Sequence, residues 1–262
     1  MQHIHIFLFC LILIVCWTSH SVCPSVHAVA EVVILDNHSS YKDTAGYLHV
    51  VGEVENTGNE SVRFVQVVGT FHDNQSNIIL QDNTFAMLEI LPPGSRSPFD
   101  LFLVSSSPDI ISRIDNYELN IDFTETNQTL TRTLLLLSKY NYISNVTGYL
   151  YIVGEIQNNG TETSTFTQAF ATCYDTNGTV VAVGSAFANP YGIEYGQKAA
   201  FQILILNKEQ GILVANYDIQ LKSDQAILIP EFPNISIFSI LILLLTMIFL
   251  RQKIMRQEII HV

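Results

Sequence analysis

The stretch from Gly46 to Gly58 reads GYLHVVGEVENTG, and it returns from Gly148 to Gly160 as GYLYIVGEIQNNG. The two copies lie 102 positions apart, and eight of their thirteen residues are identical. A self-similar segment at a fixed offset marks one structural unit that occurs more than once. The sequence therefore predicts two repeats of roughly 100 residues each, an ordinary size for a domain.

The repeated stretch alternates between two faces with a period of two, which is typical of a β-strand. In the first copy, the expected inward face consists of Leu48, Val50, Gly52 and Val54. The opposite face then carries Tyr47, His49, Val51 and Glu53. The second copy places inward Leu150, Ile152, Gly154 and Ile156. Each copy therefore predicts one strand of an antiparallel sheet with a single buried face.

Further apolar runs follow at the same offset, so the rest of each repeat is also predicted to be β-structure. Expected strands at 64–71 and 166–173 run into Asp73 and Asp175, within clusters of Asp and Asn that favour turns. About six or seven strands per repeat make a two-layer sandwich. The predicted fold class is all-β, with two tandem immunoglobulin-like antiparallel β-sandwiches over residues 31–126 and 127–226. The short polar link between them predicts an end-to-end arrangement.

Residues 1–30 have the form of a signal peptide. An apolar run from Ile6 to Trp17 is followed by Ala28-Val29-Ala30, the small-x-small pattern that signal peptidases accept. We expect export and a mature chain that starts near Glu31. The residues before the apolar run include histidines but no Lys or Arg, so an uncleaved anchor is an open alternative.

The C-terminal end predicts a single membrane span. Residues 227–234 form a juxtamembrane segment, 235–250 an apolar transmembrane helix, and 251–262 a cytoplasmic tail. Counted from Phe232, the apolar stretch is long enough to cross a bilayer at about 1.5 Å per residue. The tail is expected inside because it carries Arg251, Lys253 and Arg256. The prediction is a single-pass protein of the cell membrane with both repeats extracellular, at the cell surface.

Charge and cysteine content narrow the classes of partner. The chain has 12 Lys and Arg against 24 Asp and Glu, a net charge of −12, so nucleic acid is not an expected partner. Three of the four cysteines lie in the leader, which leaves Cys173 alone in the repeats. Cys173 takes the place of Phe71 of the first repeat, so we interpret it as a small core residue.

The repeats resemble a known family of modules. In both, Gly-Glu-Val-x-Asn-x-Gly or its variant precedes a strand that ends at His72-Asp73 or Tyr174-Asp175, and a glycine turn then leads into a Phe-led strand. This pattern resembles the FxLYD domain, an extracytoplasmic β-sandwich module of prokaryotes. The resemblance covers residues 31 to 226. It implies an exported accessory module without active-site residues.

The C-terminal end resembles the PEF-CTERM sorting signal of archaeal surface proteins. Its sorting motif is Pro230, Glu231 and Phe232, ahead of the apolar stretch and the basic residues. The resemblance implies cleavage near this motif by a membrane transpeptidase of the archaeosortase type. A plain type I membrane anchor is the open alternative, and either one predicts a protein held at the cell surface.

Asn-x-Ser/Thr sequons are more frequent than composition predicts. Eight occur, whereas about three would arise by chance, and several fall in predicted turns where a glycan meets no clash. The candidate glycosylation sites are Asn37, Asn59, Asn74, Asn127, Asn145, Asn159 and Asn177. The eighth, Asn234, lies too close to the predicted membrane span.

Residues that could carry catalysis or bind a metal do not converge in the sequence. The repeats contain only His38, His49 and His72, and their spacing matches no zinc or copper site. Glu53 and Glu155 lie in separate repeats, whereas paired glycosidase carboxylates lie within roughly 10 Å. No nucleophile-elbow pattern accompanies the serines. We therefore expect no enzyme activity, no cofactor and no zinc or copper.

Two weaker candidates stay open. Asp73 or Asp175 with the neighbouring Asn residues is a candidate calcium site, against simple stabilisation of a turn. Tyr47, Tyr149 and Tyr151 beside acidic residues are a candidate ligand face, against partial burial by neighbouring loops.

These observations predict a non-enzymatic cell-surface protein with duplicated modules, anchored by its C-terminus. Its expected role is in envelope structure, adhesion or interaction with surface proteins or glycans. The alternative is an extracytoplasmic ligand- or metal-binding accessory subunit of a membrane complex.

Overall fold

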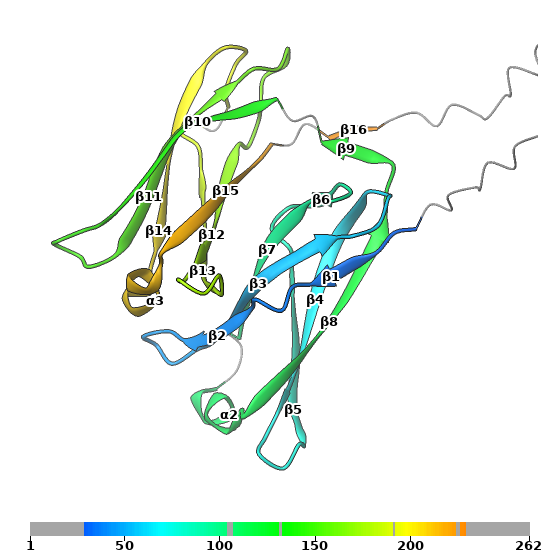
Figure 1. Ribbon diagram of the computed structural model, residues 1–262, viewed down its shortest axis with the longest axis vertical. Helices are drawn as coiled ribbons and strands as arrows, with labels where there is room; N and C mark the ends of the chain where they lie inside the picture. Colours follow the sequence, from blue (N-terminus) through cyan, green and yellow to red (C-terminus); the bar gives the residue numbers. More distant parts are fainter. Residues whose placement is uncertain (1–28, 104–106, 131–132, 191, 224–225, 229–262) are drawn as a thin grey trace, which may run out of the picture.

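The computed structural model describes residues 29–103, 107–130, 133–190, 192–223 and 226–228. Within these ranges the chain is almost entirely β-structure, with antiparallel pairing between all the named strands (Figure 1). The all-β fold class predicted from the alternation of apolar residues is confirmed. The predicted leader and membrane span lie outside the described residues.

The first repeat forms two facing sheets. We call sheet I the one built from β4 (Val62–His72), β5 (Ile78–Phe85), β6 (Ile90–Leu91) and β8 (Asn116–Glu125). Sheet II contains β1 (Val32–Ile34), β2 (Ser39–Lys42), β3 (Leu48–Asn56) and β7 (Arg96–Phe102). Apolar residues of both sheets meet in one buried cluster that includes Val50, Val67, Phe71 and Phe99.

The second repeat forms two further sheets. Sheet III contains β12 (Gln168–Tyr174), β13 (Val180–Phe187) and β15 (Asn216–Lys222). Sheet IV contains β10 (Leu134–Ile143), β11 (Leu150–Asn158) and β14 (Lys198–Ile205). Their shared core includes Ile152, Ala171 and Phe201. By strand pairing and by sequence offset, sheet III is the counterpart of sheet I, and sheet IV is the counterpart of sheet II.

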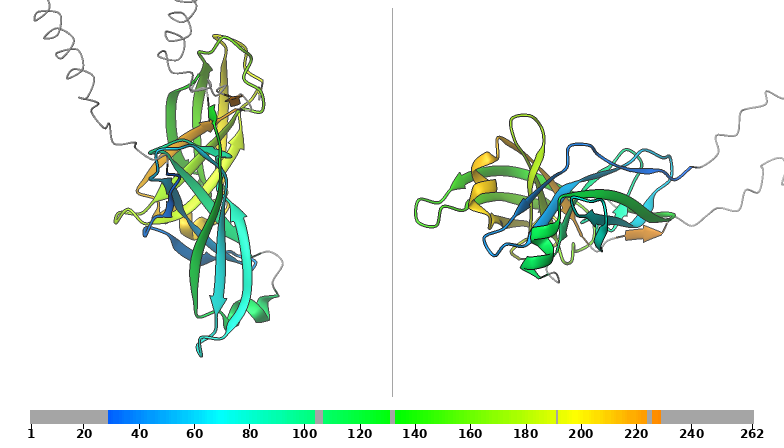
Figure 2. Two further views of the ribbon diagram at one scale, coloured as in Figure 1. Left: turned by 90° about the vertical axis from the view of Figure 1, so that its right-hand side faces the viewer. Right: turned by 90° about the horizontal axis from the view of Figure 1, so that it is seen from below.

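The two sandwiches are stacked through their sheets, in the order I, II, III, IV (Figure 1). Strand β13 lies against β2, β3 and β7, and Phe170 of β12 joins the buried cluster of the first repeat. Figure 2 shows the sandwiches offset along the long axis but overlapping where they meet. The predicted end-to-end arrangement is therefore wrong: the link is short, but the outward face of β3 is covered by sheet III around the buried Val51.

The glycine of the repeated motif is explained by an aromatic ring across the sheet. Gly52 pairs with Phe99 and Gly154 with Phe201, and each ring lies over its glycine. A Cβ at Gly52 would lie 2.7 Å from a Phe99 ring atom. A glycine weakens a strand by itself, but a cross-strand aromatic ring fills the space that its missing side chain leaves.

The asparagine of the motif is a buried hydrogen-bonding centre. The Asn56 amide donates to the Glu60 and Leu91 carbonyl oxygens at 2.8 and 2.7 Å, and its Oδ1 accepts from the Gly58 N–H at 3.0 Å. Asn158 makes the same three bonds in the second repeat. Both residues are fully buried. The predicted turn at Asn-x-Gly is confirmed, and its asparagine also holds the opposite loop in place.

Aspartates form the predicted turns after β4 and β12. Asp73 Oδ1 accepts from the backbone N–H of Gln75 and of Asn77, both at 2.9 Å. Asp175 does the same with Asn177 and Thr179. Because the backbone N–H of Thr179 favours the charged carboxylate, the pKa of Asp175 is lowered from its ordinary value.

Asp175→Asn is expected to destabilise the protein at neutral pH and to have no effect at low pH. A carboxylate whose folded-state pKa is lowered contributes stability above its ordinary pKa of 3.8, and that contribution is lost as the pH falls through the folded-state pKa. The neutral Asn imitates the protonated Asp. Melting temperatures of both forms from pH 7 to pH 2 check this, and a gap that persists at pH 2 would contradict it.

Some local features depart from the expectation. Short helices α2 (Pro108–Arg113) and α3 (Lys208–Leu213) precede the last strand of each repeat. The first strand of sheet II is broken after Ile34, whereas β10 runs on through a bulge near Leu136. β9 (Gln128–Leu130), in the link between the repeats, pairs with β16 (Ala226–Leu228) after the second repeat.

Candidate functional site: the junction between the repeats

The loop between β1 and β2 attaches the first repeat to the second. The Asn37 carbonyl accepts from the Val180 N–H at 2.8 Å, and its side-chain amide donates to the Gly178 carbonyl at 3.4 Å. Ser39 Oγ donates to the Val180 carbonyl. In the second repeat, β10 runs on without such a break, so only the first repeat has this loop.

The outward residues of β3 are buried in the junction. Val51 is 0% exposed and Glu53 is 2% exposed, although alternation places both on the solvent face of the sandwich. Tyr174 of sheet III lies near the Glu53 carboxylate, and Asn37 Nδ2 donates to Glu53 Oε2 at 3.4 Å. Burial, followed by the nearby Glu53 charge, raises the pKa of Tyr174. Glu53 is therefore buried between polar side chains of both repeats.

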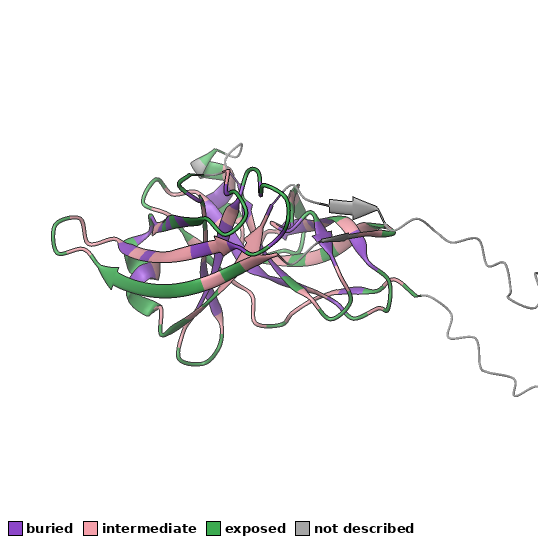
Figure 3. Ribbon diagram, turned by 90° about the horizontal axis from the view of Figure 1, so that it is seen from above, coloured by how far each residue is buried: buried purple, intermediate pink, exposed green. Residues whose placement is uncertain are grey.

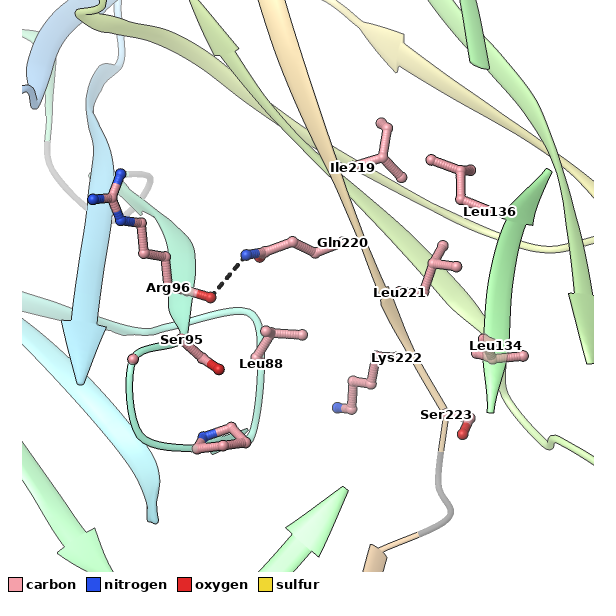
Figure 4. Close-up of a pocket in the computed structure, with 12 residues that line it drawn as sticks. Leu88, Ser95, Arg96, Leu134, Leu136, Ile219, Gln220, Leu221, Lys222 and Ser223 are labelled. Carbon is pink, nitrogen blue, oxygen red and sulfur yellow. Dashed lines mark hydrogen bonds between the residues drawn. The ribbon is translucent and has the colours of Figure 1, made fainter. Parts of the chain in front are cut away.

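A cleft of about 420 Å³ opens beside these contacts (Figure 4). The first repeat contributes the loop around β6 and β7, and the second contributes β10 and β15. Its apolar lining includes Leu88, Leu134, Leu136 and Leu221. Because the lining comes from both repeats, the cleft exists only when they are docked.

Polar groups of the two repeats meet at two points of this cleft. Gln220 Nε2 donates to the Arg96 carbonyl at 2.8 Å (Figure 4). Gln220 Oε1 is buried and accepts no hydrogen bond from the described residues. Lys222 Nζ lies 3.8 Å from Glu89 Oε2 at the edge, and Arg96 pairs with Glu55. The cleft can therefore accommodate a small ligand with an apolar body and one hydrogen-bond donor.

The predicted glycosylation sites differ in accessibility. Asn59, Asn74, Asn127, Asn145, Asn159 and Asn177 are exposed. Asn37 is partly buried, and its Nδ2, the atom that a glycan would occupy, donates across the junction. Asn234, the sorting motif at Pro230, Glu231 and Phe232, and the basic residues Arg251, Lys253 and Arg256 lie outside the described residues.

His49 lies in an aromatic stack. Its ring lies between Tyr41 and Phe102, at centroid distances of 4.8 and 4.3 Å. Its Nδ1 is 2.9 Å from Asp100 Oδ1, and Asp43 lies 3.8 Å from Nε2. Asp43 is itself held by the backbone of its own turn. These contacts place His49 as a packing residue of sheet II.

The other candidates from the sequence are dispersed. Within the described ranges, no group of three or more His, Cys, Asp or Glu side chains is placed to hold a metal ion. His38 bonds Tyr117, whereas neither ring nitrogen of His72 has a hydrogen-bond partner among these residues. Tyr47 packs edge-on against Phe102, and Tyr149 lies under the Lys208 ammonium.

Cys173 is a core residue, as its alignment with Phe71 indicates. It is 0% exposed, and burial raises the pKa of its thiol to about 12. A buried thiol with a raised pKa reacts slowly, because the thiolate is the nucleophile.

We therefore expect Cys173 to resist iodoacetamide at pH 8 in the folded protein and to react fully in denaturant. Peptide mapping by mass spectrometry separates Cys173 from the leader cysteines. Rapid labelling of Cys173 in native buffer would contradict its place in the core.

No described helix has the length and apolar character needed to cross a membrane. The predicted span at 235–250 lies outside the described residues.

No family model and no curated protein matches this sequence. Among solved structures, red sea bream transglutaminase matches 76% of this chain at 8% identity, with a TM-score of 0.23. An exo-chitosanase from Amycolatopsis orientalis matches 74% at 6% identity, with a TM-score of 0.27. The chain spans only 31% and 26% of these two structures.

Proposed function

We propose that this chain is a non-enzymatic cell-surface protein, anchored by its C-terminus, whose two immunoglobulin-like modules act in envelope structure, adhesion or binding of other surface molecules. Its single span and its sorting tail, cut by an archaeosortase-type enzyme or retained as an anchor, hold the modules outside the cell. The leader and the basic tail residues support this orientation.

The observation that supports a binding role is a group of exposed tyrosines on the outer face of sheet IV. Tyr140 and Tyr142 are 65% and 38% exposed, and Tyr142 stacks on Tyr151 at 5.2 Å. A shallow hollow of about 750 Å³ lies over this face and includes Tyr140 and Val153. Aromatic side chains are enriched in protein interfaces because they bury much area at little cost in conformational entropy. A row of them on a broad sheet suits the binding of another large molecule.

Protease treatment of intact cells tests the location. A tag inserted in the exposed loop at Val146 should be removed by added protease, and a tag at the C-terminus should be protected unless the tail has been cut. Mass spectrometry of the protein from its membrane reports leader removal, tail cleavage and glycan mass together. A protein found in the cytosolic fraction, or resistant to protease until lysis, would overturn the proposal.

The cleft at the junction favours a second candidate, a ligand-binding accessory subunit. Its apolar lining and the unpartnered Gln220 Oε1 suit a small ligand with a hydrogen-bond donor. Such a ligand raises the melting temperature by mass action. A panel of small apolar molecules that carry one hydroxyl or amide donor tests this on the full chain, with Leu221→Trp as the variant that fills the cleft. A shift that survives Leu221→Trp would place the ligand elsewhere.

A further inference from the structure

The contact between sheets II and III has an equivalent that the described residues do not make, the contact between sheets IV and I. Sheet II docks its outer face on the outer face of sheet III, and these are the counterparts of sheets IV and I. The outer faces of sheets IV and I are left at opposite ends of the stack, without cover from the described residues (Figure 3). A head-to-tail contact of this kind always leaves one free face of each type.

Sheet IV keeps the two β3 residues that are buried at the junction, although it lacks the loop with Asn37 and Ser39 between β1 and β2. Val153 takes the place of Val51, and Glu155 that of Glu53. Strand pairing places Tyr140 opposite Val153, as Ser39 lies opposite Val51, so a hydroxyl recurs there. The two faces differ in exposure, because the Glu155 side chain is 43% exposed whereas Glu53 is buried.

Sheet I shares part of its outer face with sheet III, but it has other side chains at the positions that sheet III buries in the junction. Gln66, Thr70 and Phe85 are identical to their counterparts Gln168, Thr172 and Phe187. Phe187 is 57% exposed and lies outside the junction. The junction residues Phe170, Tyr174 and Val180 are replaced in sheet I by Val68, His72 and Ile78.

The contrast between Ile78 and Val180 is the sharpest on this face. Val180 is 0% exposed because the first repeat covers it, whereas Ile78 is 66% exposed. An exposed apolar side chain at the position that its counterpart buries is what a second interface of the same kind requires.

We propose that a second copy of this chain docks the outer face of its sheet I on the outer face of sheet IV, repeating the contact between sheets II and III. Copies then add head to tail along the stacking direction. This assembly rests on the proposed role in surface interaction and names its partner. Asp122 takes the place of Lys222, and Lys198 that of Arg96, and Lys222 and Arg96 line the same cleft at the junction. The repeated contact therefore brings an acidic side chain of one copy toward a basic side chain of the other.

Sedimentation velocity of the full chain in detergent tests the assembly. The wild type should form dimers and larger species as concentration rises. Val153→Arg blocks sheet IV, and Val68→Arg blocks sheet I, so each variant alone should be monomeric, with association weakened about tenfold or more. An equimolar mixture should form dimers and nothing larger, because each variant keeps the face that the other has lost. Val146→Arg, in a loop residue that is 94% exposed, is the matched control and should assemble as the wild type.

A monomeric wild type at all concentrations, or a Val153→Arg variant that assembles normally, would overturn the proposal. A mixture that stays monomeric would do the same. Circular dichroism checks that each variant is folded, and Tyr140→Ser with Ile78→Ser is the milder pair if either arginine is not tolerated.

Cross-linking in membranes gives an independent measurement. A chain with both Glu155→Cys and His72→Cys should give a ladder of multimers with a short bismaleimide, and each single variant should give none. A surface-exposed protein without the ladder refutes the assembly alone. A protein that assembles but is not surface-exposed refutes the proposed location alone.

Discussion

Asn158→Ala is expected to lower the free energy of unfolding by about 3–5 kcal/mol. The amide donates to the Glu162 and Ile193 carbonyl oxygens at 2.7 and 2.8 Å, and Oδ1 accepts from the Gly160 N–H at 2.9 Å. Alanine leaves these three backbone groups without partners, and each buried orphan costs about 1–3 kcal/mol. Asn56→Ala should have a similar effect on the first repeat.

Urea unfolding of the full chain in detergent, followed by circular dichroism, measures this loss. Tryptophan fluorescence is unsuitable because the only tryptophan, Trp17, lies in the leader. The matched control is Asn159→Ala, because Asn159 is the exposed neighbour, and its change should stay within about 0.5 kcal/mol. A loss below about 1 kcal/mol for Asn158→Ala would show that the asparagine is not the centre of its loop.

Gly154→Ala is expected to cost about 3 kcal/mol, at the upper end of the range for overpacking. A Cβ there would lie 2.3 Å from the Ser138 carbonyl oxygen and 2.5 Å from atoms of the Phe201 ring. The ring can shift, but the carbonyl belongs to the neighbouring strand and cannot move without breaking pairing. Gly52→Ala should cost less, because its closest contacts, at 2.7 Å to His38 Cβ and the Phe99 ring, are longer and include no backbone atom.

The same unfolding experiment compares these variants. Gly192→Ala is the control, because a Cβ there meets nothing within 4 Å. Phe201→Leu in the Gly154→Ala background should restore part of the loss by removing the ring contact and leaving the carbonyl contact. Equal costs at Gly154 and Gly52 would contradict the role given to the Ser138 carbonyl.

The strands and turns were predictable because their signals are local. Alternation placed Val50 and Gly52 inward, and the Asp and Asn clusters placed the turns at Asp73 and Asp175. The helices α2 and α3 were not predictable, because six residues are too few to show a helical period. Each helix takes its position from packing against its own sandwich.

The junction depends on contacts far apart in the sequence, so its geometry could not be predicted. One signal was nevertheless present. Val51 and Phe170 are apolar residues at outward positions of otherwise polar faces, and both are buried where the repeats meet. The Asn37 sequon gave no hint that its amide is used in this contact.

The pairing of β9 with β16 determines where mechanical load enters the molecule. Antiparallel backbone bonds join Ala226 to Leu130 and Leu228 to Gln128, so the chain returns to the link between the repeats before it leaves the described structure. Tension applied beyond Leu228 therefore reaches that link first. Because only three residue pairs join β9 to β16, separation of these two strands is the first change we expect when the chain is pulled beyond Leu228.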